Sequence, residues 1–209
     1  MNIGRSVRRI AAGVLLAMGV SLVGAWADDN SPSQTAQPLV GQLLVASPSI
    51  GDAKFFHAVV LMIDEGKDGA MGLVINQPVE RLSLTALMAA IGHSEHAAEG
   101  DVAIYAGGPV QPDLGFVIHS TDYRRRETRS IDEHLALTTT PDILFDIGQA
   151  HGPRQARLCF GYTGWGPGQL EKEMQRGDWV TAPEDPDLVF GADRDEVWTK
   201  AWNRRTINL

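Results

Sequence analysis

Cysteine is nearly absent from this chain: Cys159 is the only one among 209 residues. A single cysteine excludes an intramolecular disulfide, and a chain of this length can bury enough surface to fold as one domain without a cross-link. Because the neighbours of Cys159 are Leu158 and Phe160, we expect a buried, unreactive thiol rather than a nucleophile.

Long hydrophobic runs are also lacking. The apolar segment 10–25 has 16 residues, whereas a membrane-spanning helix needs about 20. It follows three arginines and precedes Ala25-Trp26-Ala27, a small-x-small cleavage pattern. We therefore predict a signal peptide over 1–27, a flexible polar leader over 28–39 and a domain over 40–209. The prediction implies a periplasmic or secreted protein with no stable membrane span after cleavage.

Positive charge is scarce. The chain has 18 Lys and Arg against 26 Asp and Glu, a net charge of -8, and cleavage after Ala27 would remove three arginines and leave -11. Nucleic acid is an unexpected partner for such an acidic chain, because its binding depends on neutralising phosphates. The one basic cluster, Arg124 to Arg126 with Arg129, is predicted to be a solvated loop or sheet edge.

The segment 161–174, GYTGWGPGQLEKEM, has the glycines of a phosphate loop but lacks the lysine that would meet the phosphate. Pro167 removes a backbone donor, and Glu171 and Glu173 would repel an anion at the start of a helix. We therefore interpret the segment as a glycine-rich turn from strand to helix, with Trp165 as a large buried plug. The chain also lacks the Gly-x-Ser-x-Gly pentad of serine hydrolases.

Short runs rich in Val, Leu and Ile alternate irregularly with helical patterns. Buried strands are predicted at 42–46, 58–63, 72–75, 102–106, 115–119, 134–138, 154–160, 179–183 and 188–190. Helices are predicted at 83–91, at 141–150 with a cap at Thr140, at 167–176, and after Asp193. This order favours an α+β class: a single compact domain with a mixed, largely antiparallel β-sheet flanked by short helices.

No metal or cofactor is predicted. His93, His96 and Glu99 recur every three residues, but their glycine-flanked, polar segment is more typical of a solvated loop than of a metal site. His57 and His119 fall in strand patterns, where a structural role is the usual one.

Four ordered segments, 41–48, 69–78, 107–120 and 161–173, followed by Trp179 and Trp198, resemble the AlgH/YqgE family of bacterial proteins over nearly the whole chain from about Val40. The resemblance implies a compact α+β domain without an established activity or cofactor, and a transcriptional-regulator label. Family members usually begin near the position of Gly41 and are cytoplasmic, which is the alternative location for this chain. His57 and Gln77 stand where the family often has arginine, which argues against an anion site.

The first functional hypothesis is a non-enzymatic binding or regulatory protein that takes an unknown small molecule or protein. Asn76 and His119 end two similar apolar segments, and with Trp165 and Gln169 they are the predicted ligand-binding residues. A separate set of glycines is predicted to shape the backbone around them: Gly107, Gly108 and Gly164. The alternative is an uncharacterised enzyme with His119 as its general base.

Overall fold

The structure is a computed structural model that describes residues 38–93, 99–191 and 193–206, and all of these belong to one compact unit. The predicted signal peptide, most of the leader and His96 lie outside the described residues. The strands are β1 (Leu43–Ala46), β2 (Val59–Gly66), β3 (Gly69–Val74), β4 (Pro78–Ser83), β5 (Asp101–Ala106), β6 (Val110–Ser120), β7 (Arg129–Ser130), β8 (Leu135–Thr138), β9 (Ala156–Trp165) and β10 (Trp179–Ala182). The helices are the 3-10 helix η1 (Ala53–Phe55) and the α-helices α1 (Leu84–Ala90), α2 (Asp142–Gly148), α3 (Gln169–Gln175), α4 (Pro186–Val189) and α5 (Arg194–Asn203).

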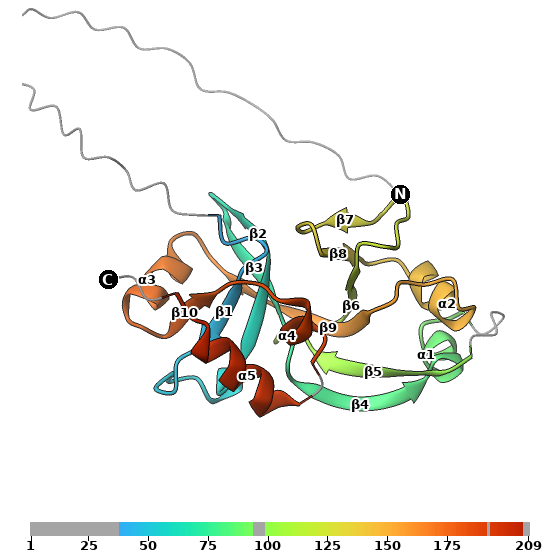
Figure 1. The fold of residues 1–209 in the computed structure, drawn as a ribbon, viewed down its shortest axis with the longest axis horizontal. Helices are drawn as coiled ribbons and strands as arrows, with labels where there is room; N and C mark the ends of the chain where they lie inside the picture. The colour runs from blue at the N-terminus through green and yellow to red at the C-terminus, as the bar shows by residue number, and fades with distance from the viewer. Residues whose placement is uncertain (1–37, 94–98, 192, 207–209) are drawn as a thin grey trace, which may run out of the picture. The chain divides into compact units, whose positions relative to one another are not determined.

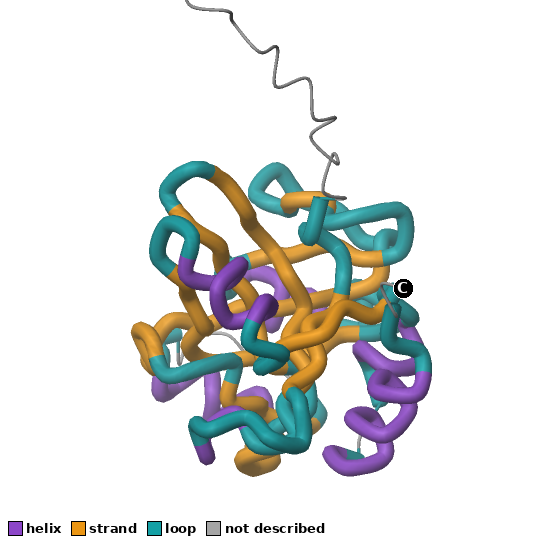
Figure 2. The backbone as a smooth tube through the Cα atoms, turned by 90° about the vertical axis from the view of Figure 1, so that its left-hand side faces the viewer, coloured by secondary structure: helices purple, strands orange, loops and turns teal. Residues whose placement is uncertain are grey.

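The strands form one sheet in the order β10-β1-β2-β3-β9-β6-β8-β7, and β4 joins it through β5 (Figure 1). Every pairing is antiparallel except that of β5 with β9. Strand β9 is central because β6 pairs along one of its edges, while β5 and then β3 share the other. Figure 2 shows the strands as a curved layer with helices outside it. The predicted α+β class and mixed, largely antiparallel sheet are confirmed.

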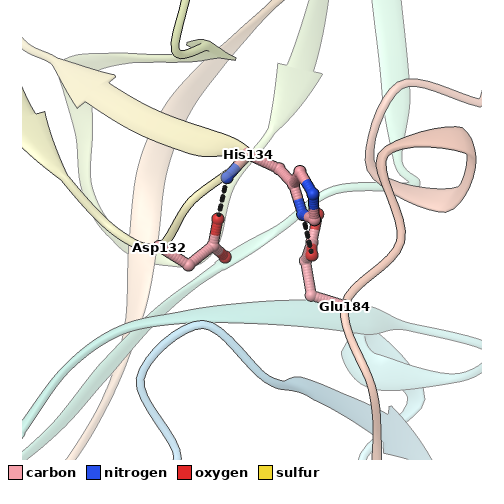
Figure 3. Close-up of side chains that lie close together, drawn as sticks. All are labelled: Asp132, His134 and Glu184. Atoms are coloured by element: carbon pink, nitrogen blue, oxygen red, sulfur yellow. Dashed lines mark hydrogen bonds and ion pairs between the residues drawn. The ribbon is translucent and has the colours of Figure 1, made fainter.

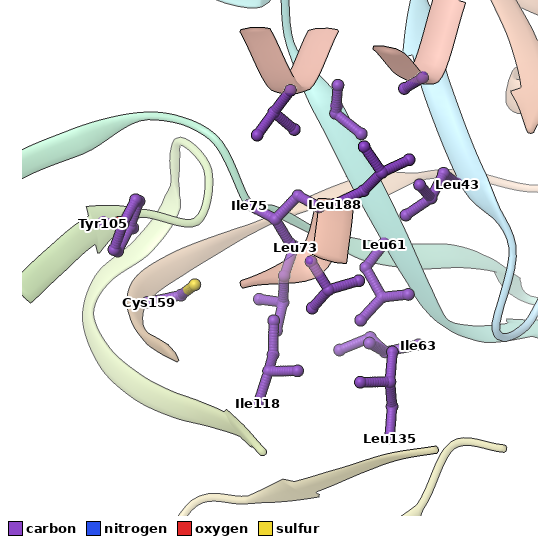
Figure 4. Close-up of a cluster of buried hydrophobic side chains, with 14 of the residues drawn as sticks. Leu43, Leu61, Ile63, Leu73, Ile75, Tyr105, Ile118, Leu135, Cys159 and Leu188 are labelled. Carbon is purple, nitrogen blue, oxygen red and sulfur yellow. The ribbon is translucent and has the colours of Figure 1, made fainter. Parts of the chain in front are cut away.

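Both faces are buried along β1 and along residues 59–63 of β2, which explains why these stretches are apolar throughout instead of alternating with polar residues. In β1, Leu43 and Val45 face a core shared with β6, β8, α4 and α5, part of which Figure 4 shows. Leu44 faces a separate core on the opposite side of the sheet, which also contains Trp165 and Trp179. A third core joins α1 and α2 to β5, β6 and β9.

The glycine segment departs from the predicted turn. Strand β9 continues through Trp165, which pairs with Ala70 of β3, with Gly161 at a left-handed φ of 72° inside it. The turn is confined to residues 166–168 before α3. Gly161 also allows a close approach of backbones, because a Cβ there would lie 2.4 Å from the carbonyl oxygen of Gly108. Glycine here therefore allows a neighbouring loop to contact the strand directly.

Two smaller predictions are wrong. Residues 188–190 are predicted as strand, but Asp185 accepts a hydrogen bond from the Asp187 backbone N–H and Pro186 follows it, so this cap and proline begin the helix α4 instead. At α2 the N-cap position is Pro141 rather than Thr140, and no side chain caps the helix.

Candidate functional site

A cleft of about 460 Å³ lies where the β9–α3 corner faces η1 and the start of β6. We name it the Trp165 cleft, and its lining includes Phe55, Val110, Trp165, Gln169, Glu173 and Trp179. Its aromatic wall is compact, because the ring centroids of Trp165 and Trp179 are 5.9 Å apart and those of Trp179 and Phe55 are 5.4 Å apart, both edge to face.

Glu173 organises this wall. One of its oxygens, Oε2, accepts hydrogen bonds from the indole N–H of Trp165 at 2.8 Å and from that of Trp179 at 2.9 Å. Its other oxygen, Oε1, accepts a 2.9 Å bond from the Gln169 side chain, whose own oxygen accepts from the Gly166 backbone N–H. The cleft therefore has a fixed carboxylate held between two tryptophans and an amide.

The charge around the cleft is negative. Asp52 and Asp178 line it together with Glu173, and the one cation among its lining residues, Arg176, donates two hydrogen bonds to Asp178. Two of the three carboxylates thus have no cationic partner in the lining. This arrangement disfavours an anionic ligand and favours a positively charged or hydrogen-bond-donating one.

Of the four predicted ligand-binding residues, Trp165 and Gln169 line this cleft, but Asn76 and His119 do not. Asn76 is 1% exposed, and its amide bonds the backbone at Val59, His57 and Arg194. Asn76 therefore does not meet Trp165 and Gln169 at the cleft, and its hydrogen-bonding groups are used inside the fold.

His119 is fully buried in β6. Its Nδ1 lies 2.9 Å from the Ser120 carbonyl oxygen and its Nε2 lies 3.0 Å from Thr138 Oγ1. Burial lowers the pKa of its imidazole. With both ring nitrogens occupied and no exposed surface, His119 is not placed to accept a proton from a substrate.

Of the three predicted structural glycines, two are required by the backbone and one is not. A Cβ on Gly107 or Gly108 would lie within 2.4 Å of the β9 backbone, so both positions require glycine. At Gly164 the nearest atom to such a Cβ is 3.4 Å away, on the Tyr162 ring. Gly164 thus borders the cleft without shaping the backbone by steric necessity.

The basic segment 124–129 is partly occupied by internal contacts. Arg125 forms a bidentate ion pair with Asp146, which also accepts a 2.6 Å hydrogen bond from Tyr123. The guanidinium of Arg125 holds the pKa of Asp146 below its usual range. Arg129 donates to the Ile63 carbonyl oxygen. These two arginines therefore serve the fold.

A second group of polar residues, which was not predicted from the sequence, lies at the opposite end of β1 from the aromatic wall of the Trp165 cleft. Asp132 and His134 precede β8, and Glu184 lies between β10 and α4; we name these three the Asp132 cluster (Figure 3). His134 Nδ1 lies 3.3 Å from Glu184 Oε2, and this hydrogen bond raises the pKa of His134. Burial first, and Asp132 second, raises the pKa of Glu184. Only the Asp-x-His spacing was visible in the sequence, because Glu184 comes from a distant segment.

The Cys159 thiol is fully buried, as predicted, and burial raises its pKa to about 12, which leaves it protonated near neutral pH. No helix within the described residues has both the length and the apolar character needed to cross a membrane.

The chain is similar in sequence and in fold to known bacterial proteins. Curated relatives include a UPF0301 protein of Methylococcus capsulatus, 43% identical over 81% of this chain and 92% of its own length, and one of Ruegeria pomeroyi, 42% identical over 78% and 89%. The solution structure of AlgH from Pseudomonas aeruginosa is similar with a TM-score of 0.68 and 34% identity, covering 83% of this chain and 92% of that one.

A crystal structure of the Corynebacterium diphtheriae protein DIP2367 shares the fold, with a TM-score of 0.65 and 22% identity over 82% of this chain and 89% of that one. The names of these relatives and solved structures mention no enzymatic activity. The model of the AlgH-like family matches residues 43–209, which include the Trp165 cleft and the Asp132 cluster. The chain therefore belongs to the AlgH-like family.

Proposed function

We propose that this protein is a non-enzymatic binding protein whose Trp165 cleft receives a small molecule carrying a positively charged or hydrogen-bond-donating group. The observation that carries the proposal is the fixed Glu173 carboxylate between Trp165 and Trp179, in a cavity of about 460 Å³. Ligand pockets of about 300–1,000 Å³ typically combine apolar walls with a few fixed polar groups. The chain's own net charge of -8 would favour the approach of a cation.

The test is a thermal-shift screen in which small amines, guanidines and quaternary ammonium compounds are compared with carboxylates and phosphates of similar size. A ligand that binds the native state raises the melting temperature, by an amount that grows with the logarithm of its concentration once this exceeds the dissociation constant. We expect the cationic compounds to stabilise the protein and the anionic ones to have no effect. Stabilisation by the anions alone would contradict the proposal.

Two charge-matched variants localise any binding. Asp52→Asn removes a carboxylate of the cleft, while an asparagine can still cap η1 as Asp52 does. Glu171→Gln removes an exposed carboxylate on α3 that does not line the cleft. For a monovalent cation we expect Asp52→Asn to weaken binding roughly two- to fivefold, the range of an exposed ion pair, and Glu171→Gln to leave it unchanged. Equal effects of the two variants would place the ligand elsewhere.

We propose no direct binding to nucleic acid, although the resemblance noted from the sequence implies a transcriptional-regulator label. The support is the acidic composition and the use of Arg125 and Arg129 in internal contacts. Duplex DNA at low salt should therefore fail to bind the purified protein. Binding that falls steeply with salt and is lost in Arg124→Ala would favour the regulatory role instead.

We propose further that the chain is exported, on the basis of the basic start, apolar run and cleavage pattern within 1–27. Amino-terminal sequencing of the protein from its native host should then give Asp28 as the first residue, and fractionation should recover it from the periplasm or the medium. An intact chain in the cytoplasm would support the family's usual location.

A further inference from the structure

The Asp132 cluster brings together three side chains of metal-ligating type from two separate segments. Each offers one ligand atom, and these atoms all lie within 4.8 Å of one another. Bonds of 2.0–2.2 Å from zinc to nitrogen and oxygen place neighbouring ligand atoms about 3–4 Å apart, so one ion can be reached with small side-chain adjustments. The cluster shares no lining residue with the Trp165 cleft and borders a separate cleft formed with residues 38–42.

Two oxygens in the cluster are buried without a partner. Within the described part of the chain, Asp132 Oδ2 and Glu184 Oε1 accept no hydrogen bond from a protein group. Both atoms are also buried from solvent, so bulk water cannot supply the missing donor. The Glu184 side chain is only 11% exposed. An orphaned buried carboxylate oxygen is costly, and two of them beside one imidazole carry more negative charge than His134 can neutralise alone. A cation between them would satisfy both.

The cluster is held by hydrogen bonds on both sides. Asp132 Oδ1 accepts from the backbone N–H groups of His134 at 2.7 Å and Leu135 at 2.8 Å, which fixes the carboxylate and leaves Oδ2 free. Next to Glu184, Asp185 caps α4 and pairs with Arg204. Ligands held in this way lose little freedom when they bind an ion.

The donor set identifies the class of ion. One imidazole nitrogen with two carboxylates suits divalent first-row transition ions, whereas magnesium and calcium prefer oxygen ligands alone. Three protein ligands also leave at least one coordination position for water.

We infer that Asp132, His134 and Glu184 form a binding site for one divalent transition-metal ion, with zinc as the representative. The inference is independent of the proposed function, because the two sites use different residues. In this site the Nδ1 or Nε2 nitrogen of His134 and one oxygen from each carboxylate contact the ion, and the hydrogen bond between His134 and Glu184 is replaced by their shared coordination.

The test is isothermal titration of the untagged, chelator-treated full chain with Zn²⁺, Mn²⁺, Mg²⁺ and Ca²⁺. We expect one Zn²⁺ per chain, weaker Mn²⁺ binding, and no heat from Mg²⁺ or Ca²⁺ at the same concentration. Glu184→Gln and His134→Asn should each weaken Zn²⁺ binding at least about tenfold, since even the loss of an outer-sphere partner has effects of that size. Asp195→Asn is the matched control, because Asp195 also pairs with a histidine, His57, at 3.1 Å, and among the described residues no second carboxylate completes a ligand group there.

A stability measurement separates a metal site from a structural ion pair. In chelator, Glu184→Gln should leave the melting temperature unchanged or raise it, because it removes one of two crowded buried carboxylates. Added Zn²⁺ should then stabilise the wild type and not the variant. Absence of zinc binding, preference for Mg²⁺, equal zinc affinity in Glu184→Gln and Asp195→Asn, or a Glu184→Gln variant that is destabilised in chelator would each overturn the inference.

Discussion

The indole N–H of Trp165 donates a 2.8 Å hydrogen bond to Oε2 of Glu173, eight residues further along the chain. Trp165 ends β9 and Glu173 lies in the middle of α3, so this bond closes the corner between strand and helix. Trp179, at the start of β10, donates to the same oxygen at 2.9 Å. Glu173 therefore ties together three consecutive elements of the chain as well as fixing the charge of the cleft.

The first prediction concerns this shared acceptor. Glu173→Ala leaves two nearly buried indole donors without a partner, and each orphaned donor costs about 1–3 kcal/mol. We expect the variant to lose roughly 2–4 kcal/mol of unfolding free energy in urea denaturation. Glu171→Ala, an exposed residue on the same helix, is the control and should cost less than about 1 kcal/mol. Similar losses in both variants would mean that Glu173 acts only through helix charge.

The second prediction compares two glycines of the signature segments. A Cβ at Gly107 would lie 2.3 Å from the Gly161 carbonyl oxygen, a backbone atom that cannot move away cheaply, whereas at Gly164 the nearest contact is an ordinary 3.4 Å. Gly107→Ala should therefore cost about 1–3 kcal/mol or more, as overpacking does, and Gly164→Ala less than about 1 kcal/mol. Equilibrium denaturation of the two variants checks the difference, and a Gly164→Ala as unstable as Gly107→Ala would contradict it.

Much of the fold could be predicted from local patterns. Serine is a favoured helix cap, and at the start of the helix predicted at 83–91 the Ser83 side chain accepts from the Ala86 backbone N–H as such a cap should. Asp68-Gly69 is a dipeptide typical of hairpin turns, and β2 and β3 are joined there. One error came from glycine: Gly161 permits contact between neighbouring backbones inside β9, and nothing local distinguishes that use from a turn.

The sites were harder to predict because they depend on which distant segments meet. Trp165 and Gln169 were accessible to prediction since they are close in sequence and belong to one corner. Asn76 has the polar type of a ligand-binding residue, but only the packing of α5 shows that the Arg194 carbonyl oxygen takes one of its hydrogen bonds. Glu184 joins His134 from fifty residues away through the pairing of β10 with β1, which no local pattern encodes.

The third prediction is a pH dependence set by His119. Burial lowers the pKa of its imidazole in the folded state, so the unfolded chain, with a histidine pKa of about 6.5, binds the proton more readily. The contribution of His119 to the free energy of unfolding is therefore fully present above about pH 6.5. It is lost as the pH falls from there to the lowered pKa of the folded state. His119→Asn should flatten this part of the profile, at some overall cost in stability.

The measurement for His119 is the free energy of unfolding at closely spaced pH values between 7.5 and 5, in chelator, for both proteins. Chelator is needed because His134, whose pKa is raised by Glu184, contributes with the opposite sign and would also respond to bound metal. The difference between the two profiles isolates His119. Parallel profiles would show that its imidazole titrates alike in the folded and unfolded states.

The last prediction decides whether Asn76 serves the fold or a ligand. Its side chain accepts from the Val59 backbone N–H at 2.9 Å and donates to the carbonyl oxygens of His57 and Arg194, so Asn76→Ala should cost about 2–4 kcal/mol by leaving these groups unpaired. Gln77→Ala removes a neighbouring amide that makes one hydrogen bond, to the Lys54 carbonyl oxygen, and should cost less than about 1 kcal/mol. Denaturation curves together with ligand titrations at a temperature where both variants are folded separate the two roles. A stable Asn76→Ala that has lost ligand binding would restore the site first predicted from the sequence, whereas a destabilised variant with unchanged affinity assigns Asn76 to the junction of β2, β3 and α5.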